Sequence, residues 1–188
     1  MTSKENADFL LEYAQSQGMT DKKELANFMG QMQVESGNFN SFHESFHYSG
    51  ERLYGVFQGR NGMDSVTKAN EIVKKGPESI AEAMYGGEWG KRHLGNTDPG
   101  DGWRFHGRGY IQLTGRDRYM TIGKELDLDL VNNPDLVATN RDVAAKVAVQ
   151  YWKDWIVRFS HQNDVDKATY DINAGGKGLV ERRAAAAE

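Results

Sequence analysis

The sequence has 188 residues, with 23 lysines and arginines against 27 aspartates and glutamates, and therefore a formal net charge of −4. Its 38% hydrophobic content separates it from disordered chains, and its length allows a sizeable core. The absence of cysteine excludes a disulfide framework, a thiolate metal site and a cysteine nucleophile. No basic run or stripe of the kind that nucleic-acid binding requires is present, so we expect no nucleic-acid partner.

The first residues, Met-Thr-Ser-Lys-Glu-Asn, lack the apolar core and the cleavage site of a secretory signal. No stretch approaches transmembrane length, so we expect no stable membrane association. If the substrate lies outside the cytoplasm, another factor must release the protein.

Capping-box patterns open the first two predicted helices. Thr2 with Glu5 precedes apolar residues at helical spacing, and Gly18 is a natural stop. Asp21 with Glu24 opens a second helix that ends at residues 36–37. Weaker helical patterns cover 51–58, 64–75 and 78–85.

The middle of the chain changes character, because eight of the 21 glycines fall in residues 86–109, and we expect a loop there. Residues 110–113 resemble a very short strand. Thr114 then has the character of a helix N-cap, with Asp117 in the first turn. Asn140 caps the longest predicted helix, which runs to about Phe159.

Towards the end of the chain, Asp164 opens another predicted helix that ends near Asn173, followed by a glycine-rich stretch. The tail over 179–188 is helical by propensity, and its alanines are either native or an addition to the natural sequence. Neither an internal repeat nor a linker divides the sequence, so we expect a single catalytic domain over 1–188 without a separate wall-binding module.

The first candidate for chemistry is a pair of carboxyl groups. Glu35 lies three residues after Met32 and seven after Phe28, on the apolar face and in the last turn of the second predicted helix. Burial and the negative end of the helix dipole both penalise its charged form, which favours a carboxyl that keeps its proton. Glu44 follows in a polar loop where it can stay ionised. Such a pair suits glycoside hydrolysis, whereas a solvated helix end is the plainer alternative for Glu35.

A second candidate uses the same region, because residues 43–47 match the H-E-x-x-H pattern of zinc peptidases. That motif requires His43 and His47 on one face of a continuous helix, together with a third protein ligand. Glycine, asparagine and serine surround the segment, and no third ligand stands at a recognisable spacing. We therefore favour surface or cleft-wall histidines, and expect no metal and no cofactor.

The third candidate is the segment 107–116, Gly-Arg-Gly-Tyr-Ile-Gln-Leu-Thr-Gly-Arg. Its glycines let the backbone approach a cleft, the Gln112 amide can bind sugar hydroxyl or acetamido groups, and the Thr114 hydroxyl can hold a water molecule. A tight connection before a capped helix is the structural alternative. The glycine spacing fits neither phosphate-binding pattern.

These motifs together resemble family 19 glycoside hydrolases, and more narrowly the compact phage endolysins of that chitinase-type family. The resemblance covers roughly residues 25–183 in the correct order. It is carried by Gly-Gln-Met-Gln-Val-Glu-Ser-Gly at 30–37, Glu44 with its following residues, Gly-Asp-Gly-Trp-Arg-Phe-His-Gly-Arg-Gly-Tyr-Ile-Gln-Leu-Thr-Gly at 100–115, Asn-Asn-Pro-Asp-Leu at 132–136 and Asp-Ile-Asn-Ala-Gly-Gly at 171–176.

The resemblance implies roles for individual residues. Glu35 corresponds to the general acid, Glu44 to the general base of the short members, and Thr114 to the residue that orients the attacking water. The substrate-binding positions that it implies are Gln112, Tyr110, Asn173 and Arg182, the last near the acid. Tyr110 and Ala174 depart from the family pattern, in which plant chitinases carry proline and a glycine follows the asparagine.

The resemblance also implies a mainly α, lysozyme-like fold with two helical lobes, a central cleft and at most a very small β element. Its mechanism would be inverting, with the two carboxyl groups roughly 6.5–9.5 Å apart to admit a water molecule. The expected activity is endolysin-type cleavage of β-1,4 bonds in bacterial peptidoglycan, which causes cell lysis.

The alternatives are a chitinase acting on chitin oligomers, the zinc peptidase, and a catalytically dead wall-binding module. No sequence feature favours a chaperone-like or purely structural role. We expect a monomer that is made in the bacterial host cytoplasm and reaches the wall with a holin or a secretion system.

Overall fold

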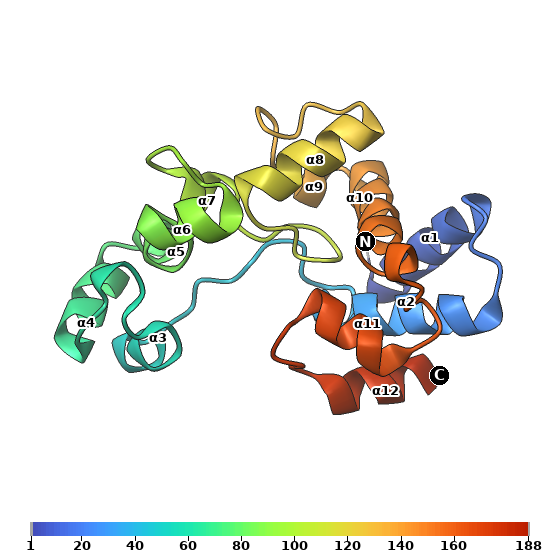
Figure 1. The fold of residues 1–188 in the computed structure, drawn as a ribbon, viewed down its shortest axis with the longest axis horizontal. Helices are drawn as coiled ribbons and strands as arrows, with labels where there is room; N and C mark the ends of the chain where they lie inside the picture. Colours follow the sequence, from blue (N-terminus) through green and yellow to red (C-terminus); the bar gives the residue numbers. More distant parts are fainter. Residues whose placement is uncertain (1, 188) are drawn as a thin grey trace.

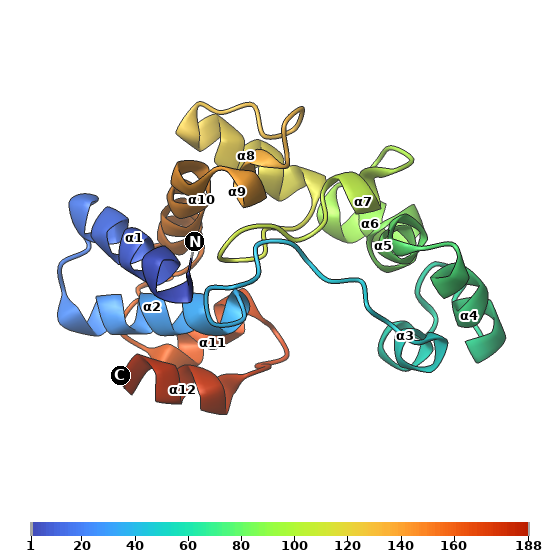
Figure 2. The same cartoon turned by 180° about the vertical axis from the view of Figure 1, so that it is seen from behind.

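Twelve α-helices and two short 3₁₀ helices form over the described residues, 2–187, in this computed structural model (Figures 1 and 2). Met1 and Glu188, the ends of the expected 1–188 domain, lie outside the described residues. The α-helices are α1 (Ser3–Ser16), α2 (Lys22–Glu35), α3 (Gly50–Phe57), α4 (Val66–Lys74), α5 (Pro77–Tyr85), α6 (Gly87–Leu94), α7 (Asp101–Arg104), α8 (Arg116–Leu126), α9 (Leu136–Thr139), α10 (Arg141–Trp155), α11 (Val165–Ile172) and α12 (Leu179–Ala187). The 3₁₀ helices are η1 (Arg60–Gly62) and η2 (Val157–Phe159). The mainly α prediction is confirmed.

The predicted helix starts are confirmed where a side chain caps the helix. In four of the helices whose capping residue the sequence named, that residue accepts a hydrogen bond from the backbone amide three residues on, a contact typically worth about 1 kcal/mol. These caps are Thr2, Asp21, Asn140 and Asp164 on α1, α2, α10 and α11. α10 ends at Trp155 rather than near Phe159, and the short helix η2 follows it.

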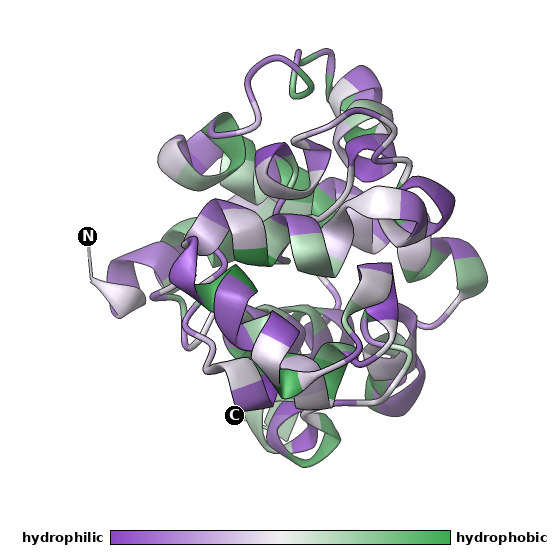
Figure 3. Ribbon diagram, turned by 90° about the vertical axis from the view of Figure 1, so that its left-hand side faces the viewer, coloured by the Kyte–Doolittle hydropathy of each residue, from purple (hydrophilic) through white to green (hydrophobic). Residues whose placement is uncertain are grey.

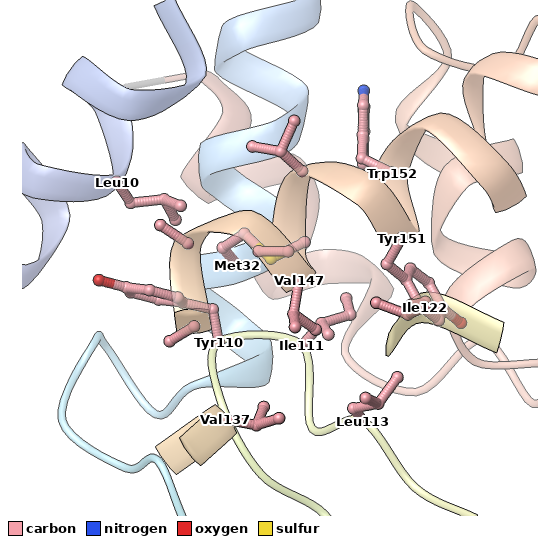
Figure 4. Close-up of a cluster of buried hydrophobic side chains, with 14 of the residues drawn as sticks. Leu10, Met32, Tyr110, Ile111, Leu113, Ile122, Val137, Val147, Tyr151 and Trp152 are labelled. Carbon is pink, nitrogen blue, oxygen red and sulfur yellow. The ribbon is translucent and has the colours of Figure 1, made fainter. Parts of the chain in front are cut away.

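Two hydrophobic clusters lie in two lobes (Figure 1). The larger cluster gathers side chains from α1, α2, α8 and α10 and from the loop at 110–113, and Figure 4 shows part of it. The smaller cluster lies among α3, α4 and α5 and consists of Phe46, Leu53, Met63, Ala69, Ile80, Ala81 and Met84. Hydrophilic and hydrophobic residues alternate along the helices (Figure 3). No helix within residues 2–187 has both the length and the apolar character needed to cross a membrane.

Two loops pair where the chain passes between the lobes. The Gly109 amide donates to the Phe42 carbonyl at 2.8 Å, and the Glu44 amide donates to the Gly107 carbonyl at 2.9 Å. Only isolated β-bridges result in the described part of the chain, at His43–Arg108 and Arg108–Leu113. The predicted strand at 110–113 is wrong, because Gln112 adopts a left-handed backbone (φ 54°) within a tight turn.

The glycine-rich segment 86–109 is not one loop, since it contains α6 and α7. Its glycines allow close helix packing. A Cβ on Gly90 would lie 1.8 Å from the Tyr85 carbonyl oxygen, and one on Gly102 would lie 2.9 Å from the Ala81 carbonyl oxygen. The loop prediction failed because glycine marks close approach as well as turns.

The last helix packs against α2, at a point where α2 carries a glycine. A Cβ on Gly30 would lie 2.8 Å from the Ala186 amide nitrogen, so only glycine lets the two backbones approach this closely. The alanine-rich tail thus packs within the fold and holds Arg182 beside the end of α2.

The start of α8 is held by a buried carboxylate, Asp101. Gly115 rather than Thr114 precedes the helix, so the predicted Thr114 cap is wrong, whereas Asp117 does lie in the first turn. Asp101 is fully buried and accepts hydrogen bonds from Arg104 at 2.7 Å, from Arg116 at 2.9 and 3.0 Å, and from the Asp98 amide at 3.0 Å. Burial alone would raise the pKa of Asp101, but these hydrogen bonds and the two guanidinium charges outweigh it and lower the pKa.

We expect Asp101→Asn to destabilise the fold by about 2–3 kcal/mol at neutral pH, because buried guanidinium hydrogen bonds lose their charged acceptor. A carboxylate with a lowered pKa stabilises the fold above its unfolded-state pKa and loses this contribution as the pH falls through its folded-state pKa. The stability gap between wild type and variant should therefore narrow in acid. Urea denaturation across pH measures it. Asp98→Asn, which alters an exposed ion pair, is the control and should cost less than about 1 kcal/mol.

Candidate active site

Glu35 is the last residue of α2, and its carboxylate forms an ion pair with Arg182. The Arg182 Nη2 donates to Glu35 Oε1 at 2.6 Å, and the Glu35 side chain is 16% exposed. The Arg182 side chain is 3% exposed, so this ion pair is largely shielded from solvent. Arg182 is thus the partner of the proposed acid, as the resemblance implied. The sequence argument for Glu35 considered burial and the helix end, and it did not include this ion pair.

A chain of buried polar contacts holds Arg182 in place. Its Nη1 donates to Gln31 Oε1 at 2.8 Å, and its Nε donates to the Lys177 carbonyl at 3.0 Å. Gln31 Nε2 in turn donates to Thr169 Oγ1 and Asn27 Oδ1, both at 3.1 Å. α2, α11 and α12 thus jointly fix the orientation of the guanidinium against Glu35.

Asn173 lies in the same hollow as Glu35. This hollow has a volume of about 440 Å³ and is lined by Glu35, Asn173, Lys177, Glu181 and Arg182, with Val34 and Gly178. Asn173 follows α11, and its Oδ1 accepts a hydrogen bond from the Gly175 amide at 3.0 Å. The structure therefore brings three of the predicted site residues together at the end of α2.

An unusual turn follows Glu35. Gly37, Asn38 and Phe39 all have positive φ, at 57°, 60° and 63°, and the Phe39 side chain is buried. The Ser36 hydroxyl donates to the Met32 carbonyl in α2 and accepts a hydrogen bond from the Phe39 amide. Asn6 Nδ2 donates to the Phe39 carbonyl at 3.0 Å. A bulky residue in the left-handed region is uncommon, so a set of specific contacts maintains this path from Glu35 to Glu44.

Glu44 lies in the extended segment between α2 and α3, in a less polar setting than its sequence neighbours suggested. The Tyr85 hydroxyl donates to Oε1, and the Gly107 amide donates to Oε2 at 3.0 Å. Burial raises the pKa of Glu44, and the two hydrogen bonds oppose this effect. The expected loop position of Glu44 is confirmed, but the sequence argument did not include this burial, which arises from contacts with Tyr85 and Gly107 in distant segments. A raised pKa makes a carboxylate a stronger base.

Tyr85, at the end of α5, is a site residue that the sequence did not reveal. Its hydrogen bond favours the ionised form of Glu44. We expect Tyr85→Phe to raise the pKa of Glu44 further and to move the acid limb of the pH–activity profile to higher pH, because a base must be ionised to work. Activity above that limb should change less. Tyr54→Phe, on α3, is the control and should leave the profile in place.

Three side-chain oxygens converge beside Gly107. A Cβ built on this glycine would lie 2.9 Å from Gln112 Oε1, 3.1 Å from Glu44 Oε2 and 3.3 Å from Thr114 Oγ1. The Thr114 hydroxyl donates to the Gln112 carbonyl at 2.9 Å, and Gln112 Nε2 donates to the Gly109 carbonyl at 3.0 Å. The side-chain oxygens of Glu44, Thr114 and Gln112 thus lie close together against the backbone of Gly107.

We expect Gly107→Ala to lower kcat by about 100-fold while the fold persists, since displacing groups by about 1 Å can have this effect. The new methyl group would meet only side-chain ends, and the φ of Gly107 lies outside the left-handed region. Steady-state kinetics and thermal unfolding together measure the outcome. Gly55→Ala, on α3 with open space around it, is the control. Near wild-type activity of Gly107→Ala would show that the exact placement of these three oxygens has no catalytic role.

Tyr151 and Arg118 lie between the two groups of residues. Tyr151, on α10, is buried, which raises its pKa, and the negative charges of Glu35 and Asp171 raise it further. Its hydroxyl accepts a hydrogen bond from Arg118 Nη1 at 3.3 Å. Arg118 shares a second hollow with Thr114. Tyr151 therefore lies near enough to Glu35 for the carboxylate charge to act on it, and its partner Arg118 lines a hollow together with Thr114.

Tyr110 does not line the sugar cleft as predicted. Its ring is buried between Phe39 and Phe42, with centroids 6.3 and 4.9 Å away, and its hydroxyl donates to the Asn6 carbonyl at 3.1 Å. Figure 4 shows Tyr110 within the larger core. The tight turn at Gln112 directs neighbouring side chains to opposite sides, so Gln112 reaches Gly107 whereas Tyr110 joins the core.

The H-E-x-x-H segment is not helical. Residues 41–49 form no helix, so His43 and His47 do not share a helix face, and the geometry that the zinc motif needs is absent. Within residues 2–187 no three His, Asp or Glu side chains gather as metal ligands would. His43 instead lies near His106, with ring centroids 6.0 Å apart. The peptidase interpretation of this motif is therefore wrong.

Comparisons with known proteins identify relatives of the sequence. Residues 93–168 match the model of the family described as chitinase class I. Over 165 residues the chain is 38% identical to a Haemophilus influenzae protein named "glycosyl hydrolase family 19 domain-containing protein", covering 88% of this chain and 78% of that protein. It is also 54% identical over 48 residues to an acidic endochitinase of Petunia hybrida, covering 26% of this chain and 19% of the plant protein.

Solved structures share the fold. A bacterial family 19 chitinase superposes with a TM-score of 0.59 at 19% sequence identity, covering 97% of this chain and 81% of that one. A chitinase C mutant superposes with a TM-score of 0.58, also at 19% identity, covering 88% and 69% of the two chains. The lysozyme-like, mainly α fold expected from the sequence is thus confirmed.

Proposed function

Because the chain belongs to glycoside hydrolase family 19, and is therefore a glycoside hydrolase, we propose that it cleaves the β-1,4 bonds of bacterial peptidoglycan by an inverting mechanism and so causes cell lysis. The described residues act in this proposal as one catalytic domain. The expected substrate is a polysaccharide, and both lobes contribute to the groups that contact it.

In the proposed mechanism, Glu35 donates its proton to the glycosidic oxygen as the bond to the sugar carbon breaks. Glu44 accepts a proton from a water molecule, which attacks that carbon from the opposite face. Thr114 and Gln112 orient the water and the sugar beside Gly107. Arg182 orients the Glu35 carboxyl before the reaction and stabilises the carboxylate that remains after proton transfer.

One observation carries the assignment of roles: the convergence of Glu44, Thr114 and Gln112 oxygens beside Gly107. A base needs a second group to hold the attacking water, and Thr114 and Gln112 offer such groups near the Glu44 carboxylate. Glu35 has no part in that cluster and pairs with Arg182 on another side. We therefore assign the base to Glu44, beside Thr114 and Gln112, and the acid to Glu35, which lies apart from them.

Peptidoglycan and chitin are both β-1,4-linked polymers that contain N-acetylglucosamine. The resemblance of residues 25–183 to compact phage endolysins supports peptidoglycan, and the similarity of a 48-residue segment to a plant endochitinase supports chitin as the second candidate. We favour peptidoglycan. The formal charge of −4 offers no attraction to anionic envelopes, so we propose that access to the wall depends on release by a holin or a secretion system.

Loss of turbidity tests the proposal. Added protein should clear bacteria whose outer membrane has been permeabilised, should leave intact Gram-negative cells turbid, and should release little soluble sugar from chitin. Activity on chitin alone would overturn the peptidoglycan assignment and leave the glycoside hydrolase intact. Glu35→Gln protein should clear no cells, whereas clearing by that variant would indicate a binding module that acts without catalysis.

A further inference from the structure

A hollow of about 300 Å³ adjoins Thr114 and has a composition that the hydrolysis of a neutral sugar chain does not require. Its walls come from the ends of α6, α8 and α10, and the residues that matter for binding are His93, Asp117, Arg118 and Trp155. Since Thr114 belongs both to this hollow and to the cluster beside Gly107, a ligand in the hollow lies next to the proposed site of bond cleavage.

Arg118 is held by aromatic rings in a way that leaves its donors available. The guanidinium carbon lies 5.6 Å from the centroid of the Tyr151 ring and 5.2 Å from that of the Trp155 ring. Within residues 2–187 its one hydrogen-bond acceptor is the Tyr151 hydroxyl. A guanidinium has five N–H donors in a rigid fork that matches a carboxylate, so this side chain is positioned for a second, anionic partner.

The other lining residues offer a ring face and a polar rim for a sugar, and they include one carboxylate, Asp117. The Trp155 side chain is 38% exposed and offers an apolar face for a sugar ring. His93 stacks on Trp89, with ring centroids 4.7 Å apart, and supplies a further polar group at the rim. The Asp117 carboxylate lies against Gly95, where a Cβ would be only 2.1 Å from Oδ1, and its charge acts on Arg116.

We propose that Arg118 binds a carboxylate carried by the muramyl residues of peptidoglycan, on the peptide stem or, where a muramyl residue lacks its stem, on the free lactyl group. This proposal rests on the proposed function, because chitin carries no such substituent. It makes Arg118 a determinant of specificity, since recognition of an acidic substituent next to the cleaved bond favours peptidoglycan over a neutral polymer of the same linkage.

Three forms of one purified peptidoglycan test the proposal: the native material, the same material with its carboxylates converted to methylamides, and strands stripped of their stems by an amidase. We expect Arg118→Met to lower kcat/KM on native peptidoglycan by about tenfold, as the loss of a charged hydrogen bond does, and to have little effect on the amidated form. Stripping the stems frees the lactyl carboxyl groups, which the stems hold as amides. A tenfold effect on stripped strands therefore shows that Arg118 also binds a lactyl carboxylate, and a lost effect shows that it binds the stem carboxylates alone.

Matched variants separate charge from packing. Arg118→Lys keeps the charge and should recover part of the lost activity on native peptidoglycan. Arg158→Met removes the same charge from η2, outside the hollow, and should leave kcat/KM unchanged. Equal losses of kcat/KM for Arg118→Met on native and amidated peptidoglycan, with wild-type enzyme active on both, would overturn the role of Arg118. The proposed function would not be affected by that result. Wild-type enzyme inactive on all three forms would instead refute the proposed function.

Discussion

Glu35→Gln is expected to lower kcat by about 10³-fold on peptidoglycan, because general acid catalysis typically contributes 10²–10⁴-fold. The amide cannot release a proton to the glycosidic oxygen, yet it has nearly the same shape as the carboxylic acid. KM should change little, since the sugar contacts remain. Steady-state release of reducing ends from purified peptidoglycan measures the effect.

The fold of this variant should persist, at a modest cost. Arg182 keeps Gln31 and the Lys177 carbonyl as acceptors, and the glutamine oxygen can replace Oε1 of Glu35, so we expect a loss of about 1–2 kcal/mol of stability. Glu181→Gln alters an exposed carboxylate in the same hollow and should keep wild-type activity. A Glu35→Gln enzyme within tenfold of wild type would remove Glu35 from the mechanism.

Glu44→Gln is expected to lower kcat by a similar factor, about 10³-fold, for a different reason. The amide cannot accept a proton from the attacking water, although Thr114 and Gln112 keep their places beside Gly107. A glycoside with a strongly acidic phenol as its leaving group distinguishes the two roles. It needs no proton donor, so it should restore much of the activity of Glu35→Gln and little of that of Glu44→Gln.

Glu51→Gln, on the first turn of α3, is the control for Glu44→Gln and should keep full activity. The reverse pattern, with the activated substrate rescuing Glu44→Gln and not Glu35→Gln, would exchange the roles of acid and base. Rescue of both variants would show that neither carboxyl group handles the water.

The sequence predicted features that depend on neighbours along the chain. The caps at Thr2, Asp21 and Asn140 each accept a hydrogen bond from the amide three residues later, so they depend on nearby sequence alone. The position of Glu35 follows from its helical spacing to Met32. Segment 86–109 shows the limit of such reasoning. Its glycines let helices pack closely against backbone carbonyl oxygens. Composition alone does not distinguish glycines of this kind from glycines in a loop.

Contacts between distant segments could not be predicted from the residues alone. Tyr85 lies 41 positions from Glu44, at the end of a helix whose pattern indicated only an apolar face. Its contact with Glu44 depends on how the 105–110 loop passes between the lobes. The burial of Tyr110 likewise depends on the positive φ of Gln112, which alternating residue types do not reveal. Arg182 was located near Glu35, 147 positions away, only through the family resemblance.

Digestion of purified peptidoglycan in ¹⁸O-labelled water, followed by mass spectrometry of the soluble products, tests the central claim most directly. Hydrolysis of a glycosidic bond places one labelled oxygen on the new reducing sugar, since the attacking water supplies that oxygen. The account predicts this label on the sugar and none in the peptide stems. Label in a stem carboxylate, unlabelled anhydro products, or no soluble product at all would contradict it.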